Sequence, residues 1–78
     1  MSETITDGLR FETMEFESDL ASVTISRVTS INNPSMPPAA TIEVKDKCKA
    51  YTMDRIDLER FEAIKTIRDA IDQYISMS

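Results

Sequence analysis

The sequence contains no histidine or tryptophan, and it has only one glycine and one cysteine among its 78 residues. Without histidine the chain lacks the commonest general base and the commonest zinc ligand. A single cysteine cannot form an internal disulfide and is typical of a reducing compartment. One glycine cannot build the glycine-rich loops that hold phosphates or dinucleotides. These shortages predict a protein that is not an enzyme and that uses no metal or cofactor.

The few groups that could still carry chemistry have a simpler interpretation. Cys48 falls on the inward side of a predicted strand, which favours a buried structural thiol over a nucleophile. Glu15 and Glu17 are a pair of carboxylates, but catalysis by two carboxylates needs a cleft that gives each a different environment. Their place on a strand surface does not predict such a cleft.

The chain also lacks long apolar runs. No stretch approaches the ~20 apolar residues of a membrane span, and the polar, acidic start is unlike a signal peptide. We therefore expect a cytoplasmic protein, in the host cytoplasm if it is viral. At this length there is room for one domain, residues 1–78, which buries only ~60% of its unfolded surface. Domains with so small a core often gain stability by oligomerisation.

Acidic residues are concentrated at the start of the chain. Residues 1–20 hold six acidic side chains against Arg10 alone, whereas residues 21–78 hold eight acidic and eight basic ones. This segment is either an acidic patch that binds a basic partner or a charged strand edge that resists unwanted pairing. The candidate partner-binding residues of the acidic strand are Glu12, Glu15, Glu17 and Asp19.

Residues 57–75 are predicted to form an amphipathic helix. Apolar residues recur at spacings of three and four, the period of one helix face: Leu58, Phe61, Ile64, Ile67, Ile71, Tyr74 and Ile75. Asp57 is the expected N-cap, with Asp54 as a rival one turn earlier. A flank of further residues widens the apolar arc beyond what one sheet needs. Either a loop covers this flank or it forms a homodimer contact: Ala63, Ala70, Tyr74 and Met77.

Strands are predicted for most of the remaining chain. Residues 1–7 are expected to be a loose leader, and residues 8–17 a strand with a bulge near residues 12–14, where the apolar phase slips. A turn at residues 18–20 leads to a strand at 21–29. Residues 39–53 form one long or bent strand, or else two short strands with a turn at Asp46-Lys47. The lack of glycine there favours the single strand.

All three prolines fall in residues 31–38, which predicts a stiff, extended loop. Ile31 and Met36 are apolar side chains on this loop. They either fold back over the core or project as a recognition tip. The predicted fold is therefore α+β: a small antiparallel sheet of three to four strands, with one C-terminal amphipathic helix packed on one face.

A row of basic residues supplies an alternative function. If residues 39–53 form one strand, four side chains project from the helix-free face: Lys45, Lys47, Lys49 and Tyr51. A basic row with an aromatic residue on an open sheet is how some proteins bind single-stranded nucleic acid. Glutamates on a neighbouring strand could instead pair with these lysines.

The tiny acidic sheet followed by Ile56-Asp57-Leu58 and the helix from Phe61 to Ile71 resembles small phage-encoded accessory proteins, including anti-CRISPR and other host-inhibitor types. The resemblance lies in architecture and size. It implies a non-catalytic protein-binding module that inhibits or modulates a larger host complex. Besides the nucleic-acid alternative, a structural or assembly subunit remains open.

Overall fold

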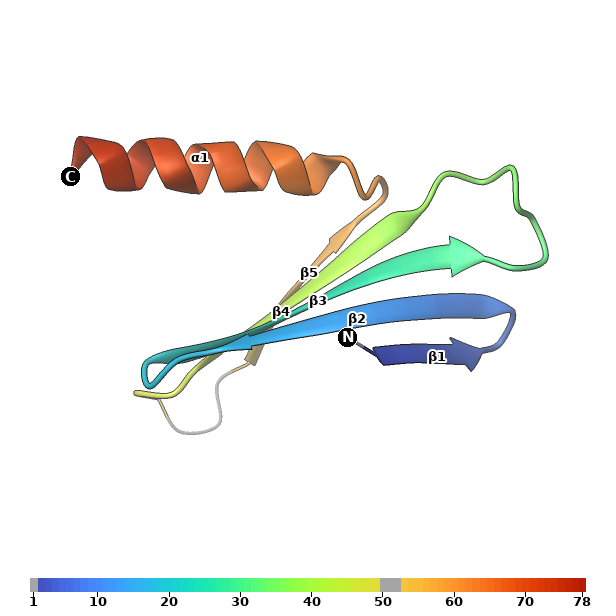
Figure 1. Cartoon of the computed structure of the whole chain (residues 1–78), viewed down its shortest axis with the longest axis horizontal. Coiled ribbons are helices and arrows are strands. Elements are labelled where there is room, and N and C mark those ends of the chain that lie inside the picture. Colours follow the sequence, from blue (N-terminus) through green and yellow to red (C-terminus); the bar gives the residue numbers. More distant parts are fainter. Residues whose placement is uncertain (1, 50–52) are drawn as a thin grey trace.

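The computed structural model of this chain describes residues 2–49 and 53–78. Each strand pairs antiparallel with the next, in the sheet order β1-β2-β3-β4-β5, and the helix follows the last strand (Figure 1). The α+β class is confirmed, with five strands in place of three or four. The elements are β1 (Ser2–Thr6), β2 (Leu9–Glu17), β3 (Ala21–Ser30), β4 (Ala39–Asp46), β5 (Met53–Leu58) and α1 (Ala63–Met77).

The expected loose leader is wrong, because residues 2–6 form β1 and pair with the first half of β2. The connection between them is the two-residue turn Asp7-Gly8, with φ angles of 52° and 74°. Two successive positive φ angles match the twist of an antiparallel hairpin, and Asp-Gly is the dipeptide that adopts them most readily. A Cβ on Gly8 would lie 2.4 Å from Nδ2 of Asn32, so this turn also has no room for a side chain.

The expected bulge in β2 is also wrong. Pairing with β3 runs without interruption from Leu9 opposite Ser30 to Glu17 opposite Ser22. The apolar phase slips because the two ends of β2 use opposite faces of the sheet, and no extra residue is inserted. Leu9 lies on one face and Phe16 lies on the other.

The register separates the two faces of the sheet. The face that meets the start of α1, called the helix face below, carries mostly apolar residues. The opposite face, called the serine–threonine face, carries the row Thr13, Ser26 and Thr41. The hydroxyls of Thr13 and Ser26 are 2.8 Å apart and hydrogen-bonded, which satisfies the buried Ser26.

The preferred single strand over residues 39–53 is wrong. A turn follows Asp46, as the alternative expected, but the next strand is β5 (Met53–Leu58), which lies almost entirely beyond the range of the predicted second strand. β4 ends at Asp46, whose carboxylate Oδ1 accepts a hydrogen bond from the Cys48 N–H at 2.9 Å, while its carbonyl accepts from the Lys49 N–H at 3.2 Å. An aspartate that binds the backbone two residues later can make a turn without glycine. Cys48 lies exposed in this turn, so the expected buried thiol is wrong as well.

The helix begins at Ala63 and not at Asp57. Residues 53–58 pair with β4 as the edge strand β5, and this pairing removes both predicted caps, Asp54 and Asp57, from the helix. Glu62 is the N-cap residue, and its side chain makes no capping hydrogen bond. The helical periodicity of residues 57–58 is therefore overridden by sheet pairing, and residues 59–62 form a link before the helix.

The molecule has little core. In the described residues the buried side chains are Ala40, Ile42 and Ser26, and α1 has no buried residue. The radius of gyration is 14.3 Å, whereas a compact chain of this length is expected near ~11.5 Å. Figure 1 shows the cause: α1 leaves the end of β5 and runs away from the strands. The predicted packing of the helix across a sheet face is thus limited to its start.

Candidate functional site

An apolar cleft lies where the start of the helix meets the sheet. It has a volume of about 290 Å³ and is open to solvent on one side. Strands β2 and β3 form one wall, and the start of the helix forms the other. The lining residues are Glu12, Met14, Phe16, Ile25, Arg27, Phe61 and Ile64.

The sheet register extends this wall into a wider apolar surface. Met14, Ile25, Ile42 and Ile56 are directly opposite one another across four strands, and a second row runs beside them. We call the two rows the apolar strip: Met14, Phe16, Val23, Ile25, Ile42, Val44 and Ile56. Ile42 is 7% exposed at its centre, but Met14 is 43% and Phe16 is 50% exposed. The strip is therefore covered in the middle and open at its edges.

The second part of the surface is the apolar side of α1. We call it the helix stripe: Ile64, Ile67, Ile71, Tyr74, Ile75 and Met77. These residues follow the three- and four-residue spacing of one helix face. Exposure rises along the stripe, and reaches 53% at Ile71 and 80% at Met77. Ile64 and Ile67 are half-buried, whereas the stripe is exposed from Ile71 onward in the part of the chain that the structure describes.

Residues 59–62 hold the helix in this position. The Phe61 N–H donates to the Pro38 carbonyl at 2.8 Å, which ties the link to the end of the proline-rich loop. The Arg27 guanidinium lies 5.3 Å from the centre of the Phe61 ring, within the range of a cation–π contact. Phe61 is thus the anchor between the helix and the helix face.

The solvent-accessible surface of the whole chain is unusually large. It measures 6366 Å², about 1,600 Å² more than the ~4,800 Å² expected for a compact monomer of 8.8 kDa. Compact monomers rarely expose contiguous apolar patches above a few hundred Å². The edges of the apolar strip and the end of the helix stripe are part of this exposed surface.

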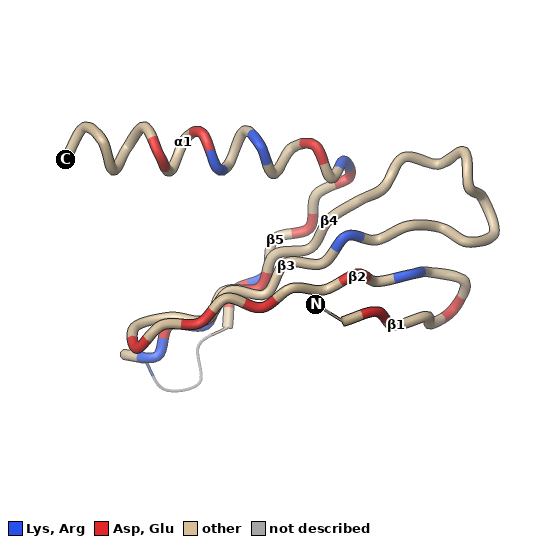
Figure 2. Tube along the Cα trace, viewed as in Figure 1, with Lys and Arg blue, Asp and Glu red and all other residues tan. Residues whose placement is uncertain are grey.

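The predicted acidic strand is not one surface. Glu12 lies on the helix face, between Glu3 and Arg27 in register, whereas Glu15 and Glu17 lie on the serine–threonine face. Asp19 lies in the turn between β2 and β3. Figure 2 shows acidic and basic residues interspersed along the sheet. Successive side chains of a strand point to opposite faces of the sheet, so acidic residues that are close in the sequence are divided between the two faces.

Glu17 also has a basic partner. Its carboxylate accepts a hydrogen bond from the Lys47 ammonium. This hydrogen bond and the attraction to the Lys47 charge hold the pKa of the Glu17 carboxyl below its ordinary value. Part of the acidic cluster is thereby neutralised inside the chain.

The predicted lysine row is not formed. Lys45 lies on β4, while Lys47 and Lys49 lie in the turn that follows it, so the three side chains do not alternate along one strand. Tyr51 lies outside the described residues. The nucleic-acid hypothesis required a continuous strand, and the turn at Asp46 interrupts it.

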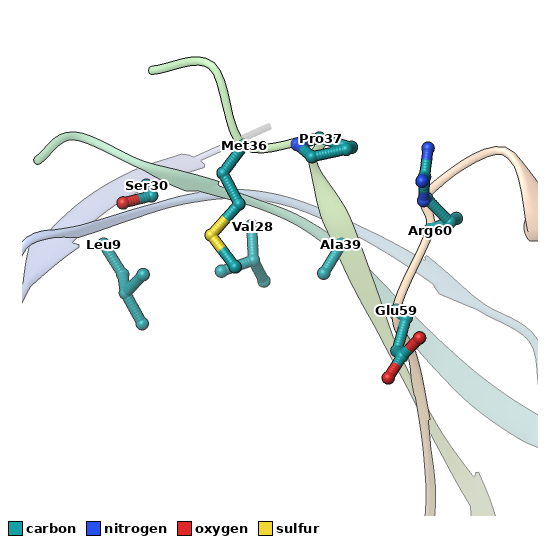
Figure 3. Close-up of a pocket in the computed structure, with 8 residues that line it drawn as sticks. All are labelled: Leu9, Val28, Ser30, Met36, Pro37, Ala39, Glu59 and Arg60. Atoms are coloured by element: carbon teal, nitrogen blue, oxygen red, sulfur yellow. The ribbon is translucent and has the colours of Figure 1, made fainter. Parts of the chain in front are cut away.

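The proline-rich loop folds back toward the sheet at Met36. Figure 3 shows the Met36 side chain over Val28 and beside Leu9. We call this group the loop cluster: Leu9, Val28, Met36, Pro37 and Ala39, which line an open pocket of about 430 Å³ together with Ser30, Glu59 and Arg60. Both loop side chains are exposed, Ile31 by 47% and Met36 by 57%. They differ in that Met36 lines the pocket and Ile31 does not.

The exposure of the predicted dimer flank rises along α1, as it does for the helix stripe. Ala63 is half-buried at the start of α1, whereas Ala70, Tyr74 and Met77 are exposed. The sequence reasoning missed the apolar strip as a candidate site. The sequence signal for the strip is the phase slip of β2, because Met14 and Phe16 lie on the face of the strand opposite to that of Leu9.

No family model, curated protein or solved structure matches this chain. Within residues 2–49 and 53–78, no cluster of three or more possible metal ligands occurs. In the same ranges, no helix has the length and apolar character needed to cross a membrane.

Proposed function

We propose that this protein is a non-catalytic protein-binding module, and that it binds through the apolar strip and the helix stripe. The observation that carries the proposal is the apolar side of α1, which extends from the sheet and whose apolar side chains are half or more exposed from Ile71 onward. An amphipathic helix gains most of its stability in a protein from burying such a face. A protein partner would supply the cover that this chain lacks.

The energy available is sufficient for specific binding. Burying an Ile or Phe side chain completely stabilises a complex by about 1.5–3 kcal/mol relative to full exposure. Met14, Phe16, Ile71 and Ile75 are each roughly half exposed, so together they could contribute several kcal/mol before the cost of association. Phe16 is the expected anchor, because aromatic side chains at the centre of a patch dominate many interfaces.

The acidic strand and the lysine row support this function less well. Glu12 is separated from Glu15 and Glu17 by the sheet itself, and Lys47 is paired with Glu17. The likeness in size and architecture to small phage accessory proteins adds the proposal that the partner belongs to a larger host complex. The apolar surface is the part of the molecule suited to such docking.

Site-specific photocrosslinking in producing cells tests the proposal. A photoreactive phenylalanine analogue replaces Ile71 in one variant and Phe16 in another, with the polar-face residue Gln73 as the matched control. We expect discrete adducts of defined mass from positions 71 and 16 and none from position 73. Absence of adducts at both apolar positions, with normal protein levels, would refute the proposal.

A further inference from the structure

We infer that the partner of this surface is a second copy of the same chain, and that the two copies exchange helices. The helix stripe of each copy packs on the apolar strip of the other. This inference rests on the proposed function, since it names the partner of the same surface. It also explains why one chain carries an apolar strip that is open at its edges and a helix stripe that is exposed from Ile71 onward.

The areas match a stable dimer. Each chain exposes about 1,600 Å² more than a compact monomer of its mass. This excess includes polar surface as well as the strip and the stripe, so only part of it can be buried. Burial of half of it in each copy would already reach the ~1,600 Å² of a standard complex. A partner with one apolar surface would cover either the strip or the stripe and leave the other exposed.

The exposed end of the helix stripe also fits across the strip. It runs from Ile71 to Met77, which is about 9 Å along the helix axis. The apolar strip crosses the four strands β2 to β5, which is about 14 Å at ordinary strand spacing. A reciprocal arrangement uses the same two surfaces twice, as a two-fold interface requires.

One pair of border charges is complementary. Lys65 lies beside the stripe on its polar flank, and Asp54 lies beside the strip on β5, directly opposite Val44, whereas Arg68 is already paired with Asp69 in its own chain. A helix seated on the partner sheet can bring these opposite charges together at the rim of the interface. Rim charges of this kind set the orientation of two partners more than their affinity.

The helix does not reach the strip of its own chain. The link of residues 59–62 is held by the Phe61 hydrogen bond to Pro38 and by the Arg27 contact, and these fix the direction in which α1 leaves the sheet. The strands and the helix diverge from that point (Figure 1). The first turn therefore covers one edge of the strip, and the rest of the stripe extends to where a second molecule can bind it.

The first experiment measures mass and shape together, by sedimentation equilibrium and small-angle X-ray scattering across the micromolar range. We expect a particle of twice the 8.8 kDa chain mass. Ile71→Ser and Ile75→Ser should each weaken the dimer by about tenfold or more, since each is present twice in the interface. The polar-face variant Gln73→Ala should leave the dissociation constant unchanged.

A disulfide test then separates helix exchange from other dimers. In a Cys48→Ser background, one variant carries Phe16→Cys on the strip and another carries Ile75→Cys on the stripe. We expect a mixture of the two to form a disulfide-linked dimer faster than either variant alone. A third variant, Gln73→Cys, should not link to Phe16→Cys. Preferred linking of Ile75→Cys to itself would overturn helix exchange in favour of helix-to-helix contact.

The outcomes distinguish this inference from the proposed function. A monomer with the extended radius of gyration of 14.3 Å would overturn the second copy as partner and leave the surface free for another protein. A monomer with a radius of gyration near ~11.5 Å would mean that the helix packs on its own sheet. That result would overturn both the second copy as partner and the proposed function. A dimer in which Phe16→Cys links to Ile75→Cys supports both the proposed function and helix exchange.

Discussion

The loop cluster and the apolar strip are two apolar groups on opposite faces of one sheet, and they differ in what covers them. The loop cluster, at one end of β2, is covered by Met36 from the same chain. The apolar strip, toward the other end of β2, meets only Phe61 and Ile64 at its edge. A connecting loop partly covers the first, whereas the second is open at its edges.

The cover of the loop cluster is held by local hydrogen bonds. The Asn33 N–H donates to the Ser30 hydroxyl at 3.1 Å, the Met36 N–H donates to the Asn33 carbonyl at 3.0 Å, and the Ser35 hydroxyl donates to the Asn33 side chain at 2.8 Å. Prolines restrict the rest of the loop. The helix has no comparable set of contacts beyond Phe61. The comparison teaches that short-range contacts hold the loop against the sheet, whereas the helix stripe is left exposed from Ile71 onward.

The largest effect is expected at the covered centre of the strip. Ile42→Ala removes most of a side chain that is 7% exposed, and it should lower the free energy of unfolding by about 2–4 kcal/mol. Ile75→Ala, on the open stripe, is the matched control and should cost under about 0.5 kcal/mol in dilute protein. Urea denaturation at low and high protein concentration measures both. Equal losses at low concentration would show that the stripe is already covered within one chain.

Loss of the helix anchor should have the next largest effect. Phe61→Ala removes the half-buried ring and its contact with Arg27, and should cost about 2 kcal/mol. Phe61→Leu keeps the apolar contact but loses the cation–π interaction, so it should cost about 1 kcal/mol or less. Thermal unfolding and helical circular dichroism provide the measurement. An unchanged melting temperature for Phe61→Ala would mean that the ring does not anchor α1.

A smaller effect is expected when the loop cluster is uncovered. Met36→Ser removes apolar cover from Leu9 and Val28, and because Met36 is itself 57% exposed it should cost only about 1 kcal/mol. Ile31→Ser is the control on the same loop and should have less effect, since that side chain does not line the pocket. Binding of a hydrophobic dye should rise for Met36→Ser alone. Equal behaviour of the two variants would contradict a covering role for Met36.

The smallest effect concerns Glu17 and Lys47, at the open end of β2. The pKa of the Glu17 carboxyl is lowered in the folded protein by the Lys47 hydrogen bond and charge. A lowered folded pKa contributes stability above the unfolded value of ~4.3, and this contribution is lost as the pH falls through the folded pKa. Carboxyl NMR titration should show that Lys47→Gln raises the Glu17 pKa more than Lys45→Gln does. The reverse order would show that Lys47 is not the main partner.

Some features of the fold were predictable from local pattern. The α+β class, the strands at residues 9–17 and 21–30, the turn at residues 18–20 and the main body of the helix follow from periodicity and turn residues. Strand β1 was also predictable from the sequence, because Asp7-Gly8 is a strong hairpin signal. The turn after β4 was harder to find, since Asp46 replaces glycine there.

The candidate site was only partly predictable. The helix stripe and its flank follow from spacing, and the excess apolar arc of the helix indicated a missing partner. The acidic strand and the lysine row were wrong as surfaces, since alternation separates Glu12 from Glu15 and the turn separates Lys45 from Lys47 and Lys49. Sequence proximity of charges does not place them on one face.

The sequence by itself determined which residues are apolar and with what period, and hence that this chain forms strands followed by an amphipathic helix. Tertiary structure alone decided where the helix begins, because pairing of β5 with β4 competes with helical periodicity over residues 57–58. It also decided that α1 projects from the sheet. That outcome depends on long-range contacts of Phe61 with Pro38 and Arg27, which join segments more than 20 residues apart and leave no local signal in the sequence.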